Sequence, residues 1–388
     1  MKRINRRDFI GSSGAIGALT LGSSTIASTL SAGERINVAV IGVGARGSDH
    51  LRALNEIKGF NLVAVCDVRG ARRDFARSFG SRIDAYDDYR RVLDRHDVDA
   101  VTIATPLDRH YPMAKAAIEA GKHVLCEKTM TYGIDQALDL VERADRSQKT
   151  FMVGYQYPFH TVYDQVRGLI DQNTIGRIVN IECQWNRMGD WRHPAQRDQE
   201  RLVNWRMYRQ YSKGLLAELG SHHLDFVDSL AGSAPKRVTG FGSIDYWQDG
   251  RETYDNVELI YQYPTFKMSF TSLTANDFGG YSIKIKGDGG TIVCTQNNAY
   301  LIGQDQDGGV DGFTGATRVA PHCQGREIVA ENRNATEQAF KHFYQCVVES
   351  KTPISDVRAG ARGAISVSLG VKAMMEGQVQ TWLPNYDV

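Results

Sequence analysis

The sequence has no feature that points to an unusual class of protein. Its 388 residues contain 46 Lys and Arg against 45 Asp and Glu, a net charge of +1, so nothing favours nucleic acid as a partner. No internal repeat or low-complexity tract is found, and 42% hydrophobic with 23% charged residues is ordinary for a packed chain. These values exclude disordered and collagen-like architectures, and they leave a small molecule as the expected partner.

Clustered cysteines are also missing. The six cysteines form no CxxC motif and no Cys/His spacing of the kind that binds zinc, so neither a zinc site nor a dithiol redox motif is predicted. Several stand in apolar runs, such as Cys66 in LVAVCD and Cys126 in KHVLCEK, where a thiol packs like a small hydrophobe. We expect mostly buried free thiols.

No run of residues is well suited to span a bilayer. The apolar stretch at residues 10–30 contains too many glycines and hydroxyl side chains for a span of about 20 apolar residues. It follows an arginine pair in NRRDFIG, at residues 5–11, and together they resemble a twin-arginine export signal. We expect residues 1–33 to be that signal and the protein to be periplasmic, without a stable membrane span. A membrane anchor and a frayed terminus without targeting meaning are the alternatives.

The length of the chain predicts two domains, because 388 residues exceed the size at which one core usually keeps growing. Residues 34–155 alternate β-branched apolar runs with helix-like segments, which predicts a Rossmann α/β domain. Residues 156–388 mostly alternate apolar with polar positions, which predicts an α+β domain with a mostly antiparallel sheet. The last two helical segments, 334–350 and 356–377, are expected to return to the Rossmann half.

A glycine-rich motif, G-x-G-x-x-G, follows the first β-branched run, RINVAVI. Gly42 permits a tight turn, Gly44 lets the backbone approach a pyrophosphate, and Gly47 lets the next helix pack on the strand. The N-terminus of that helix offers free N–H groups to phosphates. The predicted cofactor-binding loop consists of Gly42, Gly44, Ala45, Arg46 and Gly47.

An acidic residue stands where the ribose of a dinucleotide would be bound. The second predicted strand, NLVAVC at residues 61–66, ends at Asp67, 25 positions beyond Gly42. Its carboxylate would repel a 2′-phosphate, which favours NAD over NADP. Three arginines that follow closely could accommodate NADP, or they could simply be a solvated helix face.

Two further predicted strands end at the same edge of the sheet. DVDAVTIATP, at residues 97–106, and KHVLCEK, at residues 122–128, end where ligands bind in open α/β folds. Further cofactor contacts are therefore expected from Thr105, Pro106, His110, Glu127 and Lys128.

These segments, together with ELGSHHLD at residues 218–225, resemble the Gfo/Idh/MocA family of glucose-fructose oxidoreductase, inositol dehydrogenase and rhizopine catabolism proteins. The resemblance covers essentially everything after residue 34. AGKHVLCEK, at residues 120–128, is similar to the family's AGKHVxCEKP, which implies that Lys128 is catalytic. Physically, a lysine at a strand end can donate to the reacting oxygen, and Glu127 could orient it. Because Thr129 replaces the usual proline, a cis peptide bond after Lys128 is not expected.

The second family-like segment, LLAELGSHHLD, resembles D-x-G-x-H-x-x-D, which implies catalytic roles for Glu218 and His222. Four residues apart, their side chains would share one face of a helix. The imidazole can take a hydroxyl proton while the carboxylate orients it. His223 is expected to pack, and Asp225 to be either a third polar wall or a surface carboxylate. No metal is expected, because nicotinamide supplies the hydride acceptor.

Residues 185–213 are rich in aromatic and arginine side chains, which suit a carbohydrate ring. A structural or oligomer-interface arm is the alternative. Pro158 stands where the family often has Arg, so one usual polar contact is expected to be missing. The predicted substrate-binding residues are Lys128, Tyr157, Trp205, Arg206, Tyr208, Glu218 and His222.

The sequence therefore predicts an NAD(P)-dependent dehydrogenase or reductase of a sugar, glycoside or polyol, with Lys128 and His222 handling the proton. An NAD-dependent glycosidase that works by transient oxidation and elimination is one alternative, although such relatives have a different motif at residues 218–223. A non-enzymatic sugar- or cofactor-binding protein is another. Export would favour a tightly bound, recycled cofactor, and an open sheet face would favour a homo-oligomer, dimer or tetramer.

Overall fold

The computed structural model describes residues 35–80, 82–303, 325–331 and 333–388. The predicted signal at residues 1–33 and Cys323 lie outside these ranges. The five described cysteines are buried and free, as predicted. Among the described helices, none combines the length and the apolar character that a membrane crossing requires.

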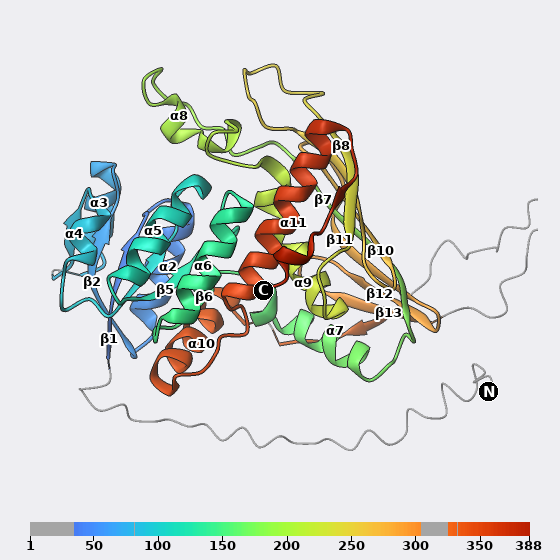
Figure 1. Ribbon diagram of the computed structural model, residues 1–388, viewed down its shortest axis with the longest axis horizontal. Coiled ribbons are helices and arrows are strands. Elements are labelled where there is room, and N and C mark those ends of the chain that lie inside the picture. The colour runs from blue at the N-terminus through green and yellow to red at the C-terminus, as the bar shows by residue number, and fades with distance from the viewer. Residues whose placement is uncertain (1–34, 81, 304–324, 332) are drawn as a thin grey trace, which may run out of the picture. The chain divides into compact units, whose positions relative to one another are not determined.

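The N-terminal half contains a six-stranded parallel sheet in the order β3-β2-β1-β4-β5-β6, the doubly wound arrangement of a Rossmann fold (Figure 1). Its central strands are apolar on both faces, because helices cover both sides. The strands are β1 (Ile36–Ile41), β2 (Phe60–Cys66), β3 (Asp84–Tyr86), β4 (Ala100–Ile103), β5 (His123–Cys126) and β6 (Phe151–Val153). The helices are α2 (Ala45–Glu56), α3 (Gly70–Arg77), α4 (Tyr89–Leu93), α5 (Leu107–Glu119) and α6 (Ile134–Arg146).

The C-terminal half contains a nine-stranded sheet in the order β14-β13-β12-β11-β7-β10-β9-β8-β15. Its pairings are antiparallel except for β10 against β7, so the predicted fold class is confirmed. The strands are β7 (Ile178–Met188), β8 (Arg237–Ser243), β9 (Asn256–Gln262), β10 (Lys267–Leu273), β11 (Ala275–Gly287), β12 (Gly290–Cys294), β13 (Ala299–Gly303), β14 (Arg326–Ile328) and β15 (Gln380–Thr381).

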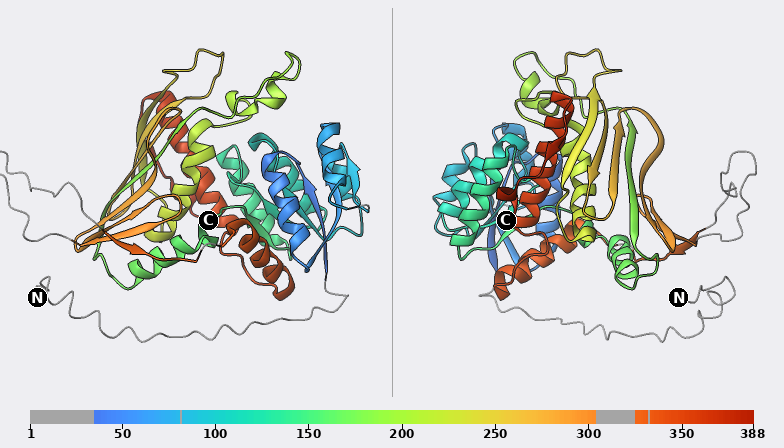
Figure 2. Two further views of the ribbon diagram at one scale, coloured as in Figure 1. Left: turned by 180° about the vertical axis from the view of Figure 1, so that it is seen from behind. Right: turned by 45° about the vertical axis from the view of Figure 1, so that its right-hand side comes forward.

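Helices join the two halves. The long helix α11 (Val357–Glu376) packs against α6, α9 (Ser221–Ala231) and β8, and α10 (Ala335–Glu349) packs against α2 (Figures 1 and 2). Phe60 and Phe343 stack where α10 meets the first sheet. The remaining helical segments are η2 (Tyr157–Phe159), α7 (Thr161–Asp171), α8 (Glu200–Val203), η3 (Trp205–Met207), η4 (Leu216–Gly220) and η5 (Pro384–Tyr386).

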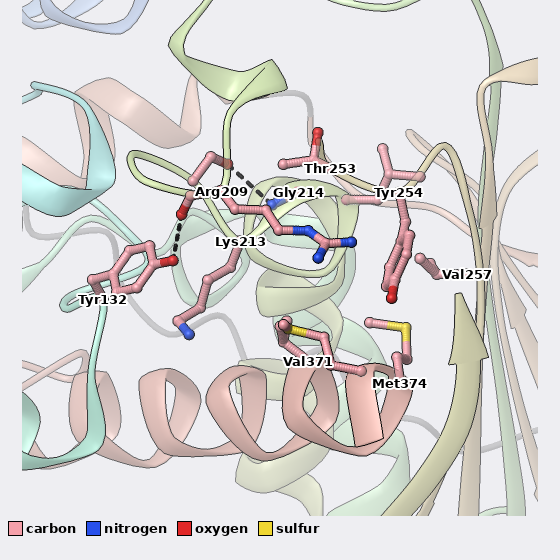
Figure 3. Close-up of a pocket in the computed structure, with 12 residues that line it drawn as sticks. Tyr132, Arg209, Lys213, Gly214, Thr253, Tyr254, Val257, Val371 and Met374 are labelled. Carbon is pink, nitrogen blue, oxygen red and sulfur yellow. Dashed lines mark hydrogen bonds between the residues drawn. The ribbon is translucent and has the colours of Figure 1, made fainter. Parts of the chain in front are cut away.

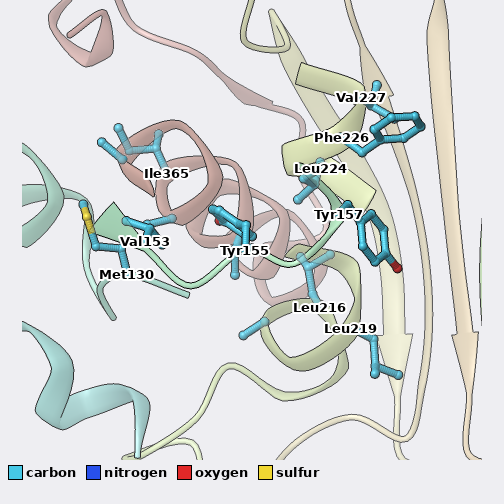
Figure 4. Close-up of a cluster of buried hydrophobic side chains, with 14 of the residues drawn as sticks. Met130, Val153, Tyr155, Tyr157, Leu216, Leu219, Leu224, Phe226, Val227 and Ile365 are labelled. Atoms are coloured by element: carbon cyan, nitrogen blue, oxygen red, sulfur yellow. The ribbon is translucent and has the colours of Figure 1, made fainter. Parts of the chain in front are cut away.

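A continuous apolar core lies beneath the predicted catalytic residues. Tyr155, after β6, is fully buried beside Leu216 of η4 and Ile365 of α11 (Figure 4). This core brings the end of the first sheet together with η4 and α9. The opposite face of the second sheet is open, with large apolar side chains exposed at Phe241, Ile260 and Phe278.

Candidate active site

The glycine-rich loop forms an open cradle at the start of α2. Gly42 has φ +88°, and a Cβ there would lie 2.6 Å from the carbonyl oxygen of Ala104. A Cβ on Gly47 would lie 1.8 Å from the Gly42 carbonyl oxygen, whereas nothing lies within 4 Å of a Cβ on Gly44. No side chain caps α2, so its first N–H groups face an open backbone surface. This cradle fits the pyrophosphate of a dinucleotide.

Asp67 stands beside the cradle at the end of β2. Its Oδ2 accepts a hydrogen bond of 2.8 Å from the Val43 N–H, and its Oδ1 accepts one of 2.9 Å from the Arg69 N–H. A carboxylate has further lone pairs, so both oxygens can still accept ribose hydroxyls. Asp67 therefore shapes the loop and remains able to bind the cofactor that the loop fits.

Glu127 forms a buried ionic cluster with two residues of α2. Its Oε1 lies 2.6 Å from Arg46 Nε and 2.9 Å from His50 Nε2. Although burial alone would raise it, the charge of Arg46 and the His50 hydrogen bond hold the pKa of Glu127 below its usual range. Arg46 also donates to Thr336 of α10, over 2.8 Å. The predicted contacts of Arg46 and Glu127 to the cofactor are thus accompanied by contacts within the protein, and His50 is a member that the sequence reasoning missed.

His110 connects the two strand ends that were predicted to face the nicotinamide. Its Nε2 lies 2.9 Å from the Thr105 carbonyl oxygen and its Nδ1 lies 2.8 Å from the Thr129 carbonyl oxygen. Pro106 precedes the first turn of α5, which also carries the buried His110. The peptide bond from Lys128 to Thr129 is cis, so the expectation from the missing proline was wrong. Tertiary contacts hold this backbone, because the Thr129 hydroxyl also donates to the Ala217 carbonyl over 3.1 Å.

Lys128 reaches across to the second half of the chain. Its Nζ donates a 2.7 Å hydrogen bond to the backbone carbonyl of Glu218, in the π-helical segment η4. Burial lowers the pKa of Lys128. The Glu218 carboxylate accepts a 2.8 Å hydrogen bond from Arg206 Nε. Although burial alone would raise it, the charges of Arg206 and Lys128 hold the pKa of Glu218 below its usual range.

His222 lies at the start of α9, on an aromatic wall. Its ring stacks on Tyr157 with centroids 5.2 Å apart, and Trp185 of β7 lies 6.2 Å away. Burial, followed by the charge of Lys128, lowers the pKa of His222 well below its usual range. Its Nδ1 is buried and has no hydrogen-bond partner within the described residues. The site therefore holds a neutral imidazole with a free nitrogen.

Two expectations about this helix needed revision. Glu218 precedes α9 in a π-helical turn, and its carboxylate binds Arg206 instead of orienting His222. Asp225 is neither a cleft wall nor a surface carboxylate, because it is buried near Asp228, and burial with that neighbour raises its pKa to about 8. His223 packs as expected, stacked on Tyr281 at 5.1 Å.

The aromatic arm, defined here as residues 185–213, contributes unequally to the site. Arg206 lies 4.2 Å from the Trp205 ring centroid and 5.6 Å from that of Trp191, and it connects both rings to Glu218. The hydroxyl of the buried Tyr208 donates to Glu200 over 3.0 Å, within the arm itself. The structure thus brings Lys128, Tyr157, Arg206, Glu218 and His222 together, and it places the polar end of Tyr208 in arm packing.

Two basic residues of the arm were not predicted individually. Arg187, near the end of β7, lies 4.4 Å from the Trp191 ring centroid. Lys213 lines a cavity of about 100 Å³, with Tyr132, Arg209, Val257, Val371 and Met374 among its walls (Figure 3). Its Nζ lies 4.3 Å from the Tyr132 ring centroid, and burial lowers its pKa to about 8. The alternation along β7 was the one sequence signal that could have identified Arg187.

No group of three or more His, Cys, Asp or Glu residues within the described part of the chain is arranged to hold a metal ion.

Two profiles of one family match the chain. The Gfo/Idh/MocA profile described as the oxidoreductase family, NAD-binding Rossmann fold, matches residues 36–155, and the profile for its C-terminal alpha/beta domain matches residues 167–382. Inositol 2-dehydrogenase of Rhodococcus erythropolis is 37% identical over 160 residues, 40% of this chain and 45% of that protein. Alpha-N-acetylgalactosaminidase of Shewanella oneidensis is 27% identical over 236 residues, 54% of this chain and 51% of that protein.

The chain spans about half the length of the curated relatives it matches. Over longer spans the similarity is in the fold. The structure of levoglucosan dehydrogenase in complex with NADH and levoglucosan superposes with a TM-score of 0.73 at 19% identity, over 89% of this chain and 99% of that one.

Proposed function

Because the chain belongs to the Gfo/Idh/MocA family of NAD-binding oxidoreductases, we propose that it oxidises a hydroxyl of a sugar, glycoside or polyol, or reduces the corresponding ketone. One observation carries the proposal: Lys128 follows Glu127, which binds Arg46 of the glycine-rich loop, and its ammonium lies 2.7 Å from the Glu218 carbonyl and acts on the neutral His222 of the aromatic wall. The names of the inositol and levoglucosan dehydrogenases support this substrate class.

The protein's own groups divide the proton chemistry between them. A nicotinamide bound at the sheet edge supplies the hydride acceptor or donor. In oxidation, His222 takes the hydroxyl proton, because its lowered pKa keeps the imidazole neutral. Its Nδ1 has no hydrogen-bond partner among the described residues. Lys128 donates a hydrogen bond to the same substrate oxygen and stabilises negative charge on it. In reduction, His222 must first be protonated, and the imidazolium gives its proton to that oxygen.

The cofactor that the residues favour is NAD. The Asp67 carboxylate, fixed on the Val43 N–H, would oppose a 2′-phosphate. Arg73 donates to the Asp67 carbonyl over 2.7 Å, so one of the three nearby arginines already has a role in the protein. Asp67→Asn keeps an oxygen for Val43 and removes the charge, so we expect it to narrow the preference for NAD over NADP in equilibrium binding. An unchanged preference would overturn this assignment.

Export by the twin-arginine route, a tightly held and recycled cofactor, and a homo-oligomer formed through the open sheet face complete the proposal. The signal-like NRRDFIG motif supports export. The exposed apolar side chains of Phe241 and Phe278 support the homo-oligomer. A reporter fused to residues 1–33 should reach the periplasm, and its Arg6→Lys, Arg7→Lys variant should not.

The first test is to identify the small molecules released from purified, extensively dialysed protein by mass spectrometry. It is followed by a screen of sugars and polyols for a change in nicotinamide absorbance. We expect NAD(H) whose redox state changes with a sugar. Protein that neither retains nicotinamide nor binds it on addition would overturn the proposal.

A second candidate function is glycoside cleavage by transient oxidation and elimination. It is favoured by the 27% identity to a relative named alpha-N-acetylgalactosaminidase. Release of nitrophenol from aryl glycosides without net change of the nicotinamide absorbance would support cleavage, and a stoichiometric absorbance change without release would support the dehydrogenase.

A further inference from the structure

Arg187 projects from β7 on the side that faces the catalytic residues. Side chains alternate between the faces of a strand, and Ile181 and Cys183 of β7 are buried against the core. Trp185 continues this series and lies 6.2 Å from His222. Arg187 is the next member, so its side chain lies on the same face of β7 as Trp185.

Three other arginines near Arg187 have carboxylate partners. Arg206 binds Glu218, Arg192 binds Glu200, and Arg251 binds both Asp190 and Asp249.

Arg187 differs from them, because within the described residues its only specific contact is the Trp191 ring. The nearest opposing charge, Asp190, is already bound by Arg251 and by the Arg192 N–H. Burial lowers the pKa of Arg187, the charge of Asp190 opposes that effect, and the charge of Arg206 adds to it. Arg187 is thus a half-buried cation whose guanidinium binds no carboxylate among the described residues.

The charges around the site leave a positive excess. Lys128 donates to a carbonyl oxygen, and the carboxylate of Glu218 is bound by Arg206. Lys128 and Arg187 are two cations of the site whose side chains have no carboxylate partner among the described residues. Lys128 is committed to the reacting oxygen, so Arg187 is left to balance one negative charge elsewhere on the substrate.

We propose that Arg187 binds the carboxylate of an acidic sugar substrate, such as a uronate, whose ring lies against the aromatic wall of Tyr157, Trp185 and His222. Both Arg187 and Arg206 lie over the Trp191 ring, at 4.4 and 5.6 Å from its centroid, so one ring connects the carboxylate-binding group to the residue that holds Glu218. A planar guanidinium matches a carboxylate in a bidentate geometry, and an aromatic face matches the C–H face of a pyranose. One unpaired cation favours a singly charged carboxylate over a phosphate. The inference rests on the proposed function, because it names the substrate class of that same site.

The test compares matched sugars on the nicotinamide-loaded protein. Glucose is compared with glucuronate and glucose 6-phosphate, and galactose with galacturonate and galactose 6-phosphate. We expect kcat/KM to be about tenfold or more higher for the acid of at least one pair, with a KM that rises with ionic strength. Arg187→Gln should lower that kcat/KM roughly 10- to 100-fold, mainly through KM, and leave the neutral sugar unaffected. The kcat/KM of Arg187→Lys for the acid should lie between that of the unchanged protein and that of Arg187→Gln.

Arg197→Gln serves as the matched control, because Arg197 is an exposed arginine of the same arm. Turnover of the neutral sugar by Arg187→Gln would show that this variant is folded. If Arg187→Gln does not fold, the same comparison of acid and neutral sugars is made with Arg187→Lys. Equal turnover of acid and neutral sugars, or an equal loss for both in Arg187→Gln, would overturn the inference and leave the dehydrogenase intact. A preference for the phosphates would overturn the carboxylate assignment. No turnover of any sugar by protein that holds nicotinamide would count against the proposed function itself.

Discussion

The Lys128 ammonium binds the backbone carbonyl of Glu218, 2.7 Å away, while the Glu218 carboxylate binds Arg206. One residue thus holds the catalytic lysine with its main chain and the aromatic arm with its side chain. This arrangement separates two effects that a substitution of Glu218 would otherwise combine.

Glu218→Gln should preserve the carbonyl that anchors Lys128 and lose the charge that holds Arg206. We expect a smaller loss of kcat than in Lys128→Met. Arg206→Gln alone should destabilise the protein more than Arg206→Gln combined with Glu218→Gln, because the single variant leaves the nearly buried Glu218 carboxylate unpaired. The coupling from a double-mutant cycle should be about 0.5–3 kcal/mol, measured by urea unfolding. Additive effects would show that the ion pair does not join the arm to η4.

Lys128→Met should reduce turnover by roughly 10²- to 10⁴-fold, the range typical for a lost proton-handling group. The cofactor should remain bound, because the glycine cradle is untouched. Steady-state kinetics and mass spectrometry of retained nicotinamide measure the two effects. Lys149→Met, at an exposed lysine, is the control. Loss of the cofactor would mean that Lys128 binds it and does not act on substrate.

The pH profile should report His222. Its folded pKa lies well below 6.5, so the neutral imidazole that accepts the proton persists as the pH falls through 6.5. We expect kcat/KM for oxidation to stay flat from pH 8 to below 6.5 and to fall only at more acidic pH. An alkaline limb should begin below 10.5, because burial lowers the pKa of Lys128. His222→Asn should remove the acid limb, and a limb that survives would belong to another group.

His110 should be needed for the geometry of the Lys128–Thr129 turn. His110→Phe removes the ring N–H that donates to one of the carbonyl oxygens of Thr105 and Thr129, and we expect a loss of about 1–3 kcal/mol in the free energy of unfolding. The kcat should fall with it. His110→Gln keeps an N–H donor and should lose less of both. Equal losses in the two variants would show that ring packing, and not hydrogen bonding, is what His110 contributes.

Lys213→Met should stabilise the protein at neutral pH. Burial lowers the pKa of Lys213 from 10.5 to about 8, so below pH 8 folding must keep an ammonium in a partly apolar cavity. That penalty is full below pH 8 and disappears as the pH rises toward 10.5, where the unfolded state also loses the proton. We expect a gain of roughly 1–3 kcal/mol at pH 7 that shrinks above pH 9. A gain that does not depend on pH would have to come from packing.

Much of the fold was determined by patterns that are local in the sequence. β-Branched runs, the spacing of Gly42, Gly44 and Gly47, and the change to period-two alternation depend only on how a strand or turn buries neighbouring side chains. The fold class and the position of Asp67 at a strand end followed from these alone. The family-like motifs at Lys128 and His222 added the candidate chemistry.

Only the tertiary structure decided which groups meet. The cis bond before Thr129, the π-helical turn at Glu218 and the burial of Asp225 depend on contacts between segments far apart in sequence. The partners of charged side chains also depend on the tertiary structure, because nothing in the sequence distinguishes Arg206 from Arg187. A guanidinium becomes a structural ion pair or a free cation according to which carboxylate the fold brings within 4 Å, and no local pattern encodes that distance.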